Sequence, residues 1–127
     1  MRSFVLNKLK IALLQASPCG SLDKNLEKGI KYCEKAKGMG VDIALFPEMW
    51  SNGYNIYDRP QNEWIAEAIP SDGAFVNAFA EAAGRLGMAV GVTLLEKYEK
   101  APRNTLVLFD RFGQRKLRHK RVEFTWF

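Results

Sequence analysis

Residues 40–48 read GVDIALFPE, a short apolar run that ends in a proline and a glutamate. The apolar run predicts a strand over residues 41–46, and Pro47 predicts its end because proline cannot donate to a strand ladder. Glu48 is therefore expected on the loop at the carboxyl end of this strand, with Trp50 and Tyr54 as aromatic neighbours. Open α/β sheets build their sites at that edge.

The residues before this stretch predict a strand and a helix. Residues 10–16 (KIALLQA) form a short, mostly apolar run that is followed by Pro18, which predicts a buried strand that ends in a turn. Asp23 is the expected N-cap of an amphipathic helix that ends at Gly38 and Gly40. The apolar positions of that helix recur at helical spacing: Leu26, Ile30, Cys33 and Ala36. Strand, helix and strand in close succession predict two parallel strands joined by a right-handed crossover.

The residues after Glu48 predict a loop, a second helix and three strands. Residues 49–60 are loop-like, and a short helical turn is expected over residues 64–68. Ser71 and Asp72 are the expected caps of a helix that Gly87 ends. Its apolar face contains Phe75, Phe79, Ala82, Ala83 and Leu86. The last strands are expected at residues 88–95, 104–109 and 114 to about 122, with a tight turn at 110–113. The predicted order is β-α-β-α-β-β-β, an α/β fold with a mixed sheet.

Composition excludes several classes of protein. The chain has 127 residues, 47% of them hydrophobic, so it can bury a core, and no apolar run approaches the roughly 18 residues of a membrane span. Cys19, Cys33 and one histidine give no metal spacing and no disulfide framework, so no metal and no cofactor are expected and a cytoplasmic location fits. The net charge of +5 comes from residues 101–127. Their charges alternate along a predicted hairpin, so a nucleic acid is not the expected partner. A membrane is not expected either, because no apolar run is long enough to span one.

Residues 44–54, ALFPEMWSNGY, resemble the first catalytic motif of the nitrilase superfamily of carbon-nitrogen hydrolases. The similarity continues in the same order through SDGAF at 71–75, GVTLLE at 91–96 and RNTLVLFDRFG at 103–113. The resemblance implies an α-β-β-α sandwich, of which residues 1–127 are the N-terminal part of a single domain. It also implies a homo-oligomer in the full-length form and a small amide, carbamoyl or nitrile substrate.

The resemblance assigns roles to individual residues. In the family, the glutamate at the position of Glu48 takes the proton from a cysteine thiol, which attacks the substrate carbon to form a thioester. A lysine helps to hold the resulting oxyanion. Counting from Gly113 places Arg121 at the lysine position, one residue after Lys120, and a small bulge would bring Lys120 there instead. Lys120 is preferred because the family's donor is an ammonium group, and Arg121 stays open. Tyr54 resembles a position close to the substrate pocket.

The nucleophile is the missing part of this constellation. Cys19 lies in a predicted turn and Cys33 on the apolar face of a predicted helix, so neither resembles a reactive thiol. The family's cysteine is expected downstream of the lysine, and residues 1–127 are therefore predicted to be inactive alone. A non-catalytic remnant that serves as an interaction or binding module is the alternative. Three other polar residues are expected to have structural or surface roles: Glu96, Asn104 and His119.

Overall fold

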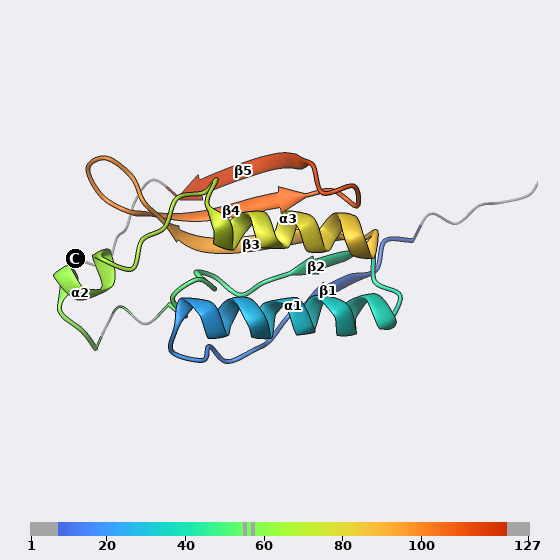
Figure 1. The fold of residues 1–127 in the computed structure, drawn as a ribbon, viewed down its shortest axis with the longest axis horizontal. Helices are drawn as coiled ribbons and strands as arrows, with labels where there is room; N and C mark the ends of the chain where they lie inside the picture. The colour runs from blue at the N-terminus through green and yellow to red at the C-terminus, as the bar shows by residue number, and fades with distance from the viewer. Residues whose placement is uncertain (1–7, 55, 57, 122–127) are drawn as a thin grey trace, which may run out of the picture.

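The computed structural model of this protein describes residues 8–54, 56 and 58–121 (Figure 1). Its elements are β1 (Ile11–Leu13), α1 (Leu22–Gly38), β2 (Ile43–Leu45), α2 (Gln61–Ile65), α3 (Ala74–Leu86), β3 (Ala89–Glu96), β4 (Arg103–Phe109) and β5 (Arg115–Arg121). This order confirms the predicted succession of elements. The predicted helical turn is present as α2, which begins earlier than expected because Pro60 occupies its N-cap with a φ of −56°.

The five strands form one mixed sheet in the order β1-β2-β3-β4-β5. β2 pairs in parallel with both β1 and β3, and β4 pairs antiparallel with both β3 and β5. The predicted mixed sheet and the parallel strand-helix-strand unit are therefore confirmed. Because β2 and β3 run in the same direction, the loop that follows β2 lies beside the end of β3.

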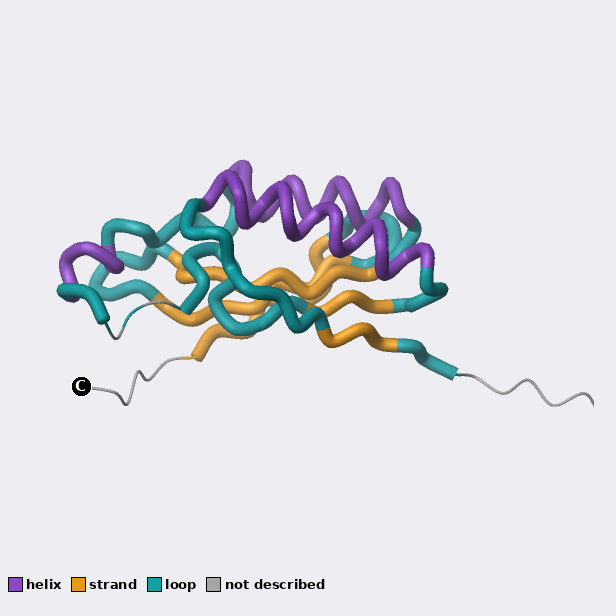
Figure 2. The backbone as a smooth tube through the Cα atoms, turned by 90° about the horizontal axis from the view of Figure 1, so that it is seen from below, coloured by secondary structure: helices purple, strands orange, loops and turns teal. Residues whose placement is uncertain are grey.

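The long helices α1 and α3 lie side by side on one face of the sheet, and Figure 2 shows no helix of the described residues on the other face. The core between them is rich in aromatic rings, and Phe79 packs against Phe46 with ring centroids 5.0 Å apart. Gly29 on α1 permits this packing, since a Cβ there would lie 2.7 Å from the ring of Phe79. None of the helices in the described residues combines the length and apolar character needed to cross a membrane.

The prediction of a buried first strand was wrong. β1 has three residues, and two of them, Ile11 and Leu13, are 49% and 68% exposed. Side chains alternate between the faces of a sheet, so only Ala12 packs against the helix-side core. The physical reason is that the helices cover a single face and β1 lies at the edge of the sheet. Leu117 on β5, which is 48% exposed, extends the apolar surface of the open face.

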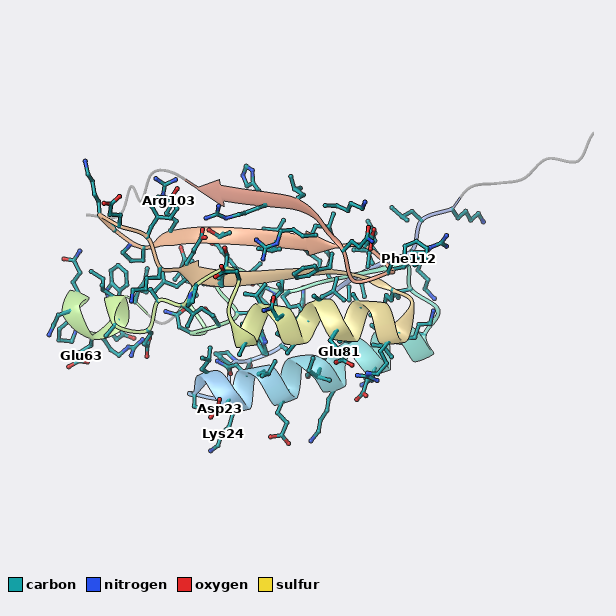
Figure 3. The ribbon with its side chains drawn as sticks, turned by 45° about the horizontal axis from the view of Figure 1, so that its top comes forward. Asp23, Lys24, Glu63, Glu81, Arg103 and Phe112 are labelled. Carbon is teal, nitrogen blue, oxygen red and sulfur yellow. The ribbon has the colours of Figure 1, made fainter. Side chains whose placement is uncertain are left out.

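The N-cap of α1 is Ser21 and not Asp23. Ser21 has an extended backbone, and its side chain accepts a hydrogen bond of 3.2 Å from the Lys24 N–H. Asp23 lies in the first turn, where a negative charge interacts favourably with the helix dipole. In Figure 3, Asp23 and Lys24 mark the start of α1, and the side chain of Lys24 points away from the sheet.

The start of α3 also differs from the prediction. Its N-cap is Gly73, which has no side chain to cap the helix, so neither Ser71 nor Asp72 caps it. The Asn77 side chain instead donates a hydrogen bond of 3.0 Å to the Asp72 carbonyl and ties the first turn to the preceding loop. Gly87 ends α3 in the left-handed conformation, with a φ of 62°, as predicted.

The turn between β4 and β5 is fixed by an aspartate and a glycine. Asp110 Oδ1 accepts hydrogen bonds of 2.9 Å from the N–H groups of Gln114 and Phe112, and these bonds lower the pKa of Asp110. Gly113 has a φ of 81°, and a Cβ there would lie 2.6 Å from the Ala80 carbonyl oxygen of α3. The turn thus packs directly against a helix backbone (Phe112 in Figure 3).

We predict that Gly113→Ala destabilises the protein more than Gly40→Ala does. Both glycines have positive φ, which costs an alanine about 1 kcal/mol or more. A Cβ at Gly40 would meet nothing within 4 Å, whereas at Gly113 it would clash with a helix carbonyl. Melting temperatures of the two variants provide the measurement. Equal losses would contradict the close contact between this turn and α3.

Candidate active site

Glu48 lies on the loop directly after β2, at the carboxyl end of the strand, as predicted. Its side chain is exposed, and its carboxylate accepts a hydrogen bond from the side-chain amide of Asn104 at the start of β4. The two residues border a concavity of about 430 Å³ on the open face, together with Leu45, Leu106 and His119. The amide of Asn104 thus binds the carboxylate at an accessible depression.

The loop that carries Glu48 is bonded to β3 on both sides of this residue. The N–H of Phe46 donates to the carbonyl of Gly91 at 3.0 Å, and the N–H of Leu95 donates to Ser51 Oγ at 3.0 Å. Met49, the next residue after Glu48, has a φ of 53° and a fully buried side chain. A non-glycine residue in this conformation is uncommon and requires support from its surroundings.

Trp50 does not provide the aromatic surroundings that were expected for Glu48. Its side chain is 1% exposed and lies in the helix-side core, where its indole N–H donates to the Asn25 carbonyl at 2.9 Å. The physical reason is the size of the apolar ring, which gains most by burial beneath α1. Tyr54 is half-buried, has a φ of 58° and packs against a smaller cluster that contains Met49. Its place beside the substrate pocket stays a prediction.

Asn104 is the site residue that the sequence reasoning missed, because it was expected to have only a structural role. It is far from Glu48 in the sequence, and its partner became evident only through the pairing of β4 with β3, in which Asn104 is opposite Leu95. Thr105, Val107 and Phe109 are buried residues that alternate along β4. That alternation places Asn104 on the open face and is the signal that could have identified it.

Glu96 belongs to the opposite face of the sheet. Its side chain is 3% exposed, and its two oxygens are bonded to the Thr105 hydroxyl, at 2.8 Å, and to the guanidinium of Arg118. A buried carboxylate requires such partners, since burying an unpaired charge would cost the folded protein several kcal/mol of stability. The ion pair links β3 to β5 and agrees with the expected structural role of Glu96.

The end of β5 faces the start of β4. Lys120 pairs with Thr105 in the strand register, and Arg121 pairs with Asn104. The register shift of this hairpin lies between Leu108 and Phe109, near the turn. Directly opposite residues of antiparallel strands share a face, so the position of Arg121 is on the Glu48 face. The side chains of Lys120 and Arg121 lie outside the described part of the chain, and the preference for Lys120 stays a prediction.

The two cysteines are in different surroundings. Cys33 is fully buried in α1, and this burial, with a smaller contribution from the negative charge of Glu34, raises the pKa of its thiol to about 12. Cys19 is exposed in the loop after β1, where its backbone N–H donates to Asn25 Oδ1 at 2.6 Å. Within the described ranges, no three His, Cys, Asp or Glu side chains are arranged to hold a metal ion.

Comparison with known proteins identifies one family. The family model described as carbon-nitrogen hydrolase matches residues 10–125. A nitrilase of Pseudomonas syringae pv. syringae (strain B728a) is 28% identical over 134 residues, which cover 94% of this chain and 40% of that protein. The chain therefore spans less than half the length of this relative.

Solved structures have the same fold. XC1258 from Xanthomonas campestris, described as a CN-hydrolase superfamily protein, matches with a TM-score of 0.74 and 24% identity, covering 91% of this chain and 41% of that one. An amidase from Nesterenkonia sp. matches with a TM-score of 0.66 and 20% identity, covering 91% and 43%. At these identities the likeness concerns the fold.

We predict that iodoacetamide at pH 8 modifies Cys19 and leaves Cys33 unmodified in the folded protein. The thiolate is the reactive form, and a thiol with a pKa of about 12 remains protonated at this pH and is also inaccessible. Peptide mass spectrometry after alkylation reports each site. Denaturant should expose Cys33 to the reagent, and rapid labelling of Cys33 without denaturant would contradict the assignment.

Proposed function

The chain belongs to the carbon-nitrogen hydrolase family, and on that premise we propose that it contributes the general base to a thiol-dependent hydrolase of small amides, nitriles or carbamoyl compounds. The observation that carries this proposal is the Glu48 carboxylate, which Asn104 holds at an accessible depression beside the ends of β2 and β3.

The proposed role of Glu48 is to take a proton from a cysteine thiol. With an amide or carbamoyl compound, the thiolate attacks the carbonyl carbon, and the leaving nitrogen receives the proton that Glu48 holds. With a nitrile, the thiolate adds to the carbon of the C≡N bond, the nitrogen takes that proton, and a first water displaces ammonia to give the thioester. Water then attacks the resulting thioester with Glu48 again as the base, which releases the acid and regenerates the thiol. A carboxylate can serve in both steps because its proton is exchanged in each.

The thiol is proposed to come from a cysteine beyond residues 1–127. Cys33 is buried beneath the sheet and protonated at neutral pH, and the Cys19 backbone is tied to α1 through Asn25. A cysteine that approached the open face would meet Glu48 from the side on which no described helix lies. In this proposal, residues 1–127 supply the base and part of the pocket but do not hydrolyse substrate alone.

The proposed oxyanion donor is a cation at the end of β5. An oxyanion forms at the substrate carbon in both attacks, and one positioned donor stabilises such a transition state by roughly 3 to 4 kcal/mol. Lys120 is the donor that the resemblance favours, and Arg121 has the register position opposite Asn104. Tyr54 is proposed to border the substrate.

We predict that Glu48→Gln in the full-length protein abolishes hydrolysis. Glutamine has nearly the same shape but cannot accept the thiol proton, so kcat should fall by at least about 100-fold. The measurement is release of ammonia from a panel of small amides, nitriles and carbamoyl compounds.

Glu27→Gln is the matched control, because Glu27 is an exposed residue of α1 and its ion pair with Lys31 is on the surface. This variant should retain full activity. Retained hydrolysis in Glu48→Gln would reject the assigned role. If the full-length wild-type protein hydrolysed none of the panel, the interpretation as a non-catalytic binding module would replace the interpretation as an enzyme.

A second prediction concerns the two cations at the end of β5. Lys120→Gln and Arg121→Gln each remove one positive charge. In the strand register, Lys120 is paired with Thr105 and Arg121 with Asn104. The variant that removes the oxyanion donor should lose about 100-fold or more in kcat, while the other should lose much less. Steady-state kinetics of both variants provide the comparison, and equally small effects would show that neither residue is the donor.

A further inference from the structure

Thr93 binds the Glu48 loop at two points with one hydroxyl group. Its Oγ1 donates a hydrogen bond to the carbonyl of Pro47 and accepts one of 3.0 Å from the backbone N–H of Trp50. Thr93 is in the middle of β3 and is 7% exposed. The donor and one acceptor site of the hydroxyl are therefore both used, and both partners belong to the loop.

The two bonds enclose the residue that carries the proposed base. The Pro47 carbonyl belongs to the peptide group that joins Pro47 to Glu48, and the Trp50 N–H is two residues further on. Between them, Met49 has the left-handed φ of 53°, which non-glycine residues rarely adopt. A conformation of this kind persists only where the surroundings determine it. The hydroxyl of Thr93 supplies such support on both sides.

We propose that Thr93 is a positioning residue that sets the backbone from which the Glu48 carboxylate projects. This inference rests on the proposed function of Glu48 as the base. Asn104 holds the carboxylate end of the side chain, and Thr93 holds the backbone end. A base that is fixed at both ends keeps its geometry toward the thiol, and a displacement of about 1 Å can lower a rate 100-fold.

The chemistry of the position explains why a hydroxyl is needed. Pro47 has no N–H, so a ladder bond between Pro47 and β3 can use only its carbonyl, which needs a donor. The Trp50 N–H needs an acceptor. A serine could provide both groups, whereas a valine of nearly the same volume provides neither and would leave the Pro47 carbonyl and the buried Trp50 N–H without these partners.

The test compares Thr93→Val with Thr93→Ser in the full-length protein. Thr93→Val should lower kcat about 100-fold with a smaller change in KM, because it misplaces the base, although Thr93 also borders the concavity beside Glu48. Hydrogen exchange over residues 47–53, measured by mass spectrometry, should become faster in the same variant. Thr93→Ser should restore most of kcat and the slow exchange.

Val90→Ala is the control for a general loss of stability. Val90 is on the same strand and is fully buried on the helix side of the sheet. This variant should lower the melting temperature and leave kcat and the exchange of residues 47–53 close to wild type. A loss of kcat as large as that of Thr93→Val would show that the effect comes from stability and would overturn the proposal.

The outcomes separate the proposal from the function on which it rests. Unchanged exchange of residues 47–53 in Thr93→Val would overturn the positioning role whether or not the protein hydrolyses the panel. Full kcat in Thr93→Val together with inactive Glu48→Gln would also overturn it and leave the base assignment intact. Activity in Glu48→Gln would instead reject the base, while the exchange result would still decide whether Thr93 holds the loop.

Discussion

β2 and β3 run parallel in a register that pairs Leu45 with Gly91, and the arrangement of the carboxyl edge follows from this pairing. Because the strands end on the same side, the loop after β2 extends along the rest of β3. Backbone and side-chain groups of β3 then bond the loop at successive points, from the Gly91 carbonyl to the Leu95 N–H. These bonds between β3 and the loop determine where Glu48 lies.

The two faces of the sheet hold two carboxylates in contrasting surroundings. Glu96 is buried on the helix side, with both oxygens occupied by Thr105 and Arg118. Glu48 is exposed on the open face, where its carboxylate accepts from the amide of Asn104. A buried carboxylate bonded to a hydroxyl and a guanidinium is suited to join strands, whereas an accessible carboxylate is better suited to exchange a proton with a substrate group. The strand alternation separates these two roles.

Much of the fold could be predicted because its signals are local. The apolar repeat of α1, the glycine that ends α3 and the proline after β2 each act within a few residues. The predictions that failed required knowledge of distant neighbours. The exposure of β1 depends on which face the helices cover, and the burial of Trp50 depends on space beneath α1. The predicted N-cap of α1 was wrong for a local reason. Ser21 and Asp23 are both suitable N-cap residues, and the backbone conformation selects Ser21.

The sequence by itself determined the order of the elements, the family and the place of Glu48 at the end of a strand, because periodicity and motif are properties of neighbouring residues. Only the tertiary structure decided that Asn104 holds the carboxylate and that one hydroxyl on β3 bonds both sides of its loop. Those contacts join residues more than 40 positions apart in the chain. They depend on strand register, which no local pattern specifies to a single residue.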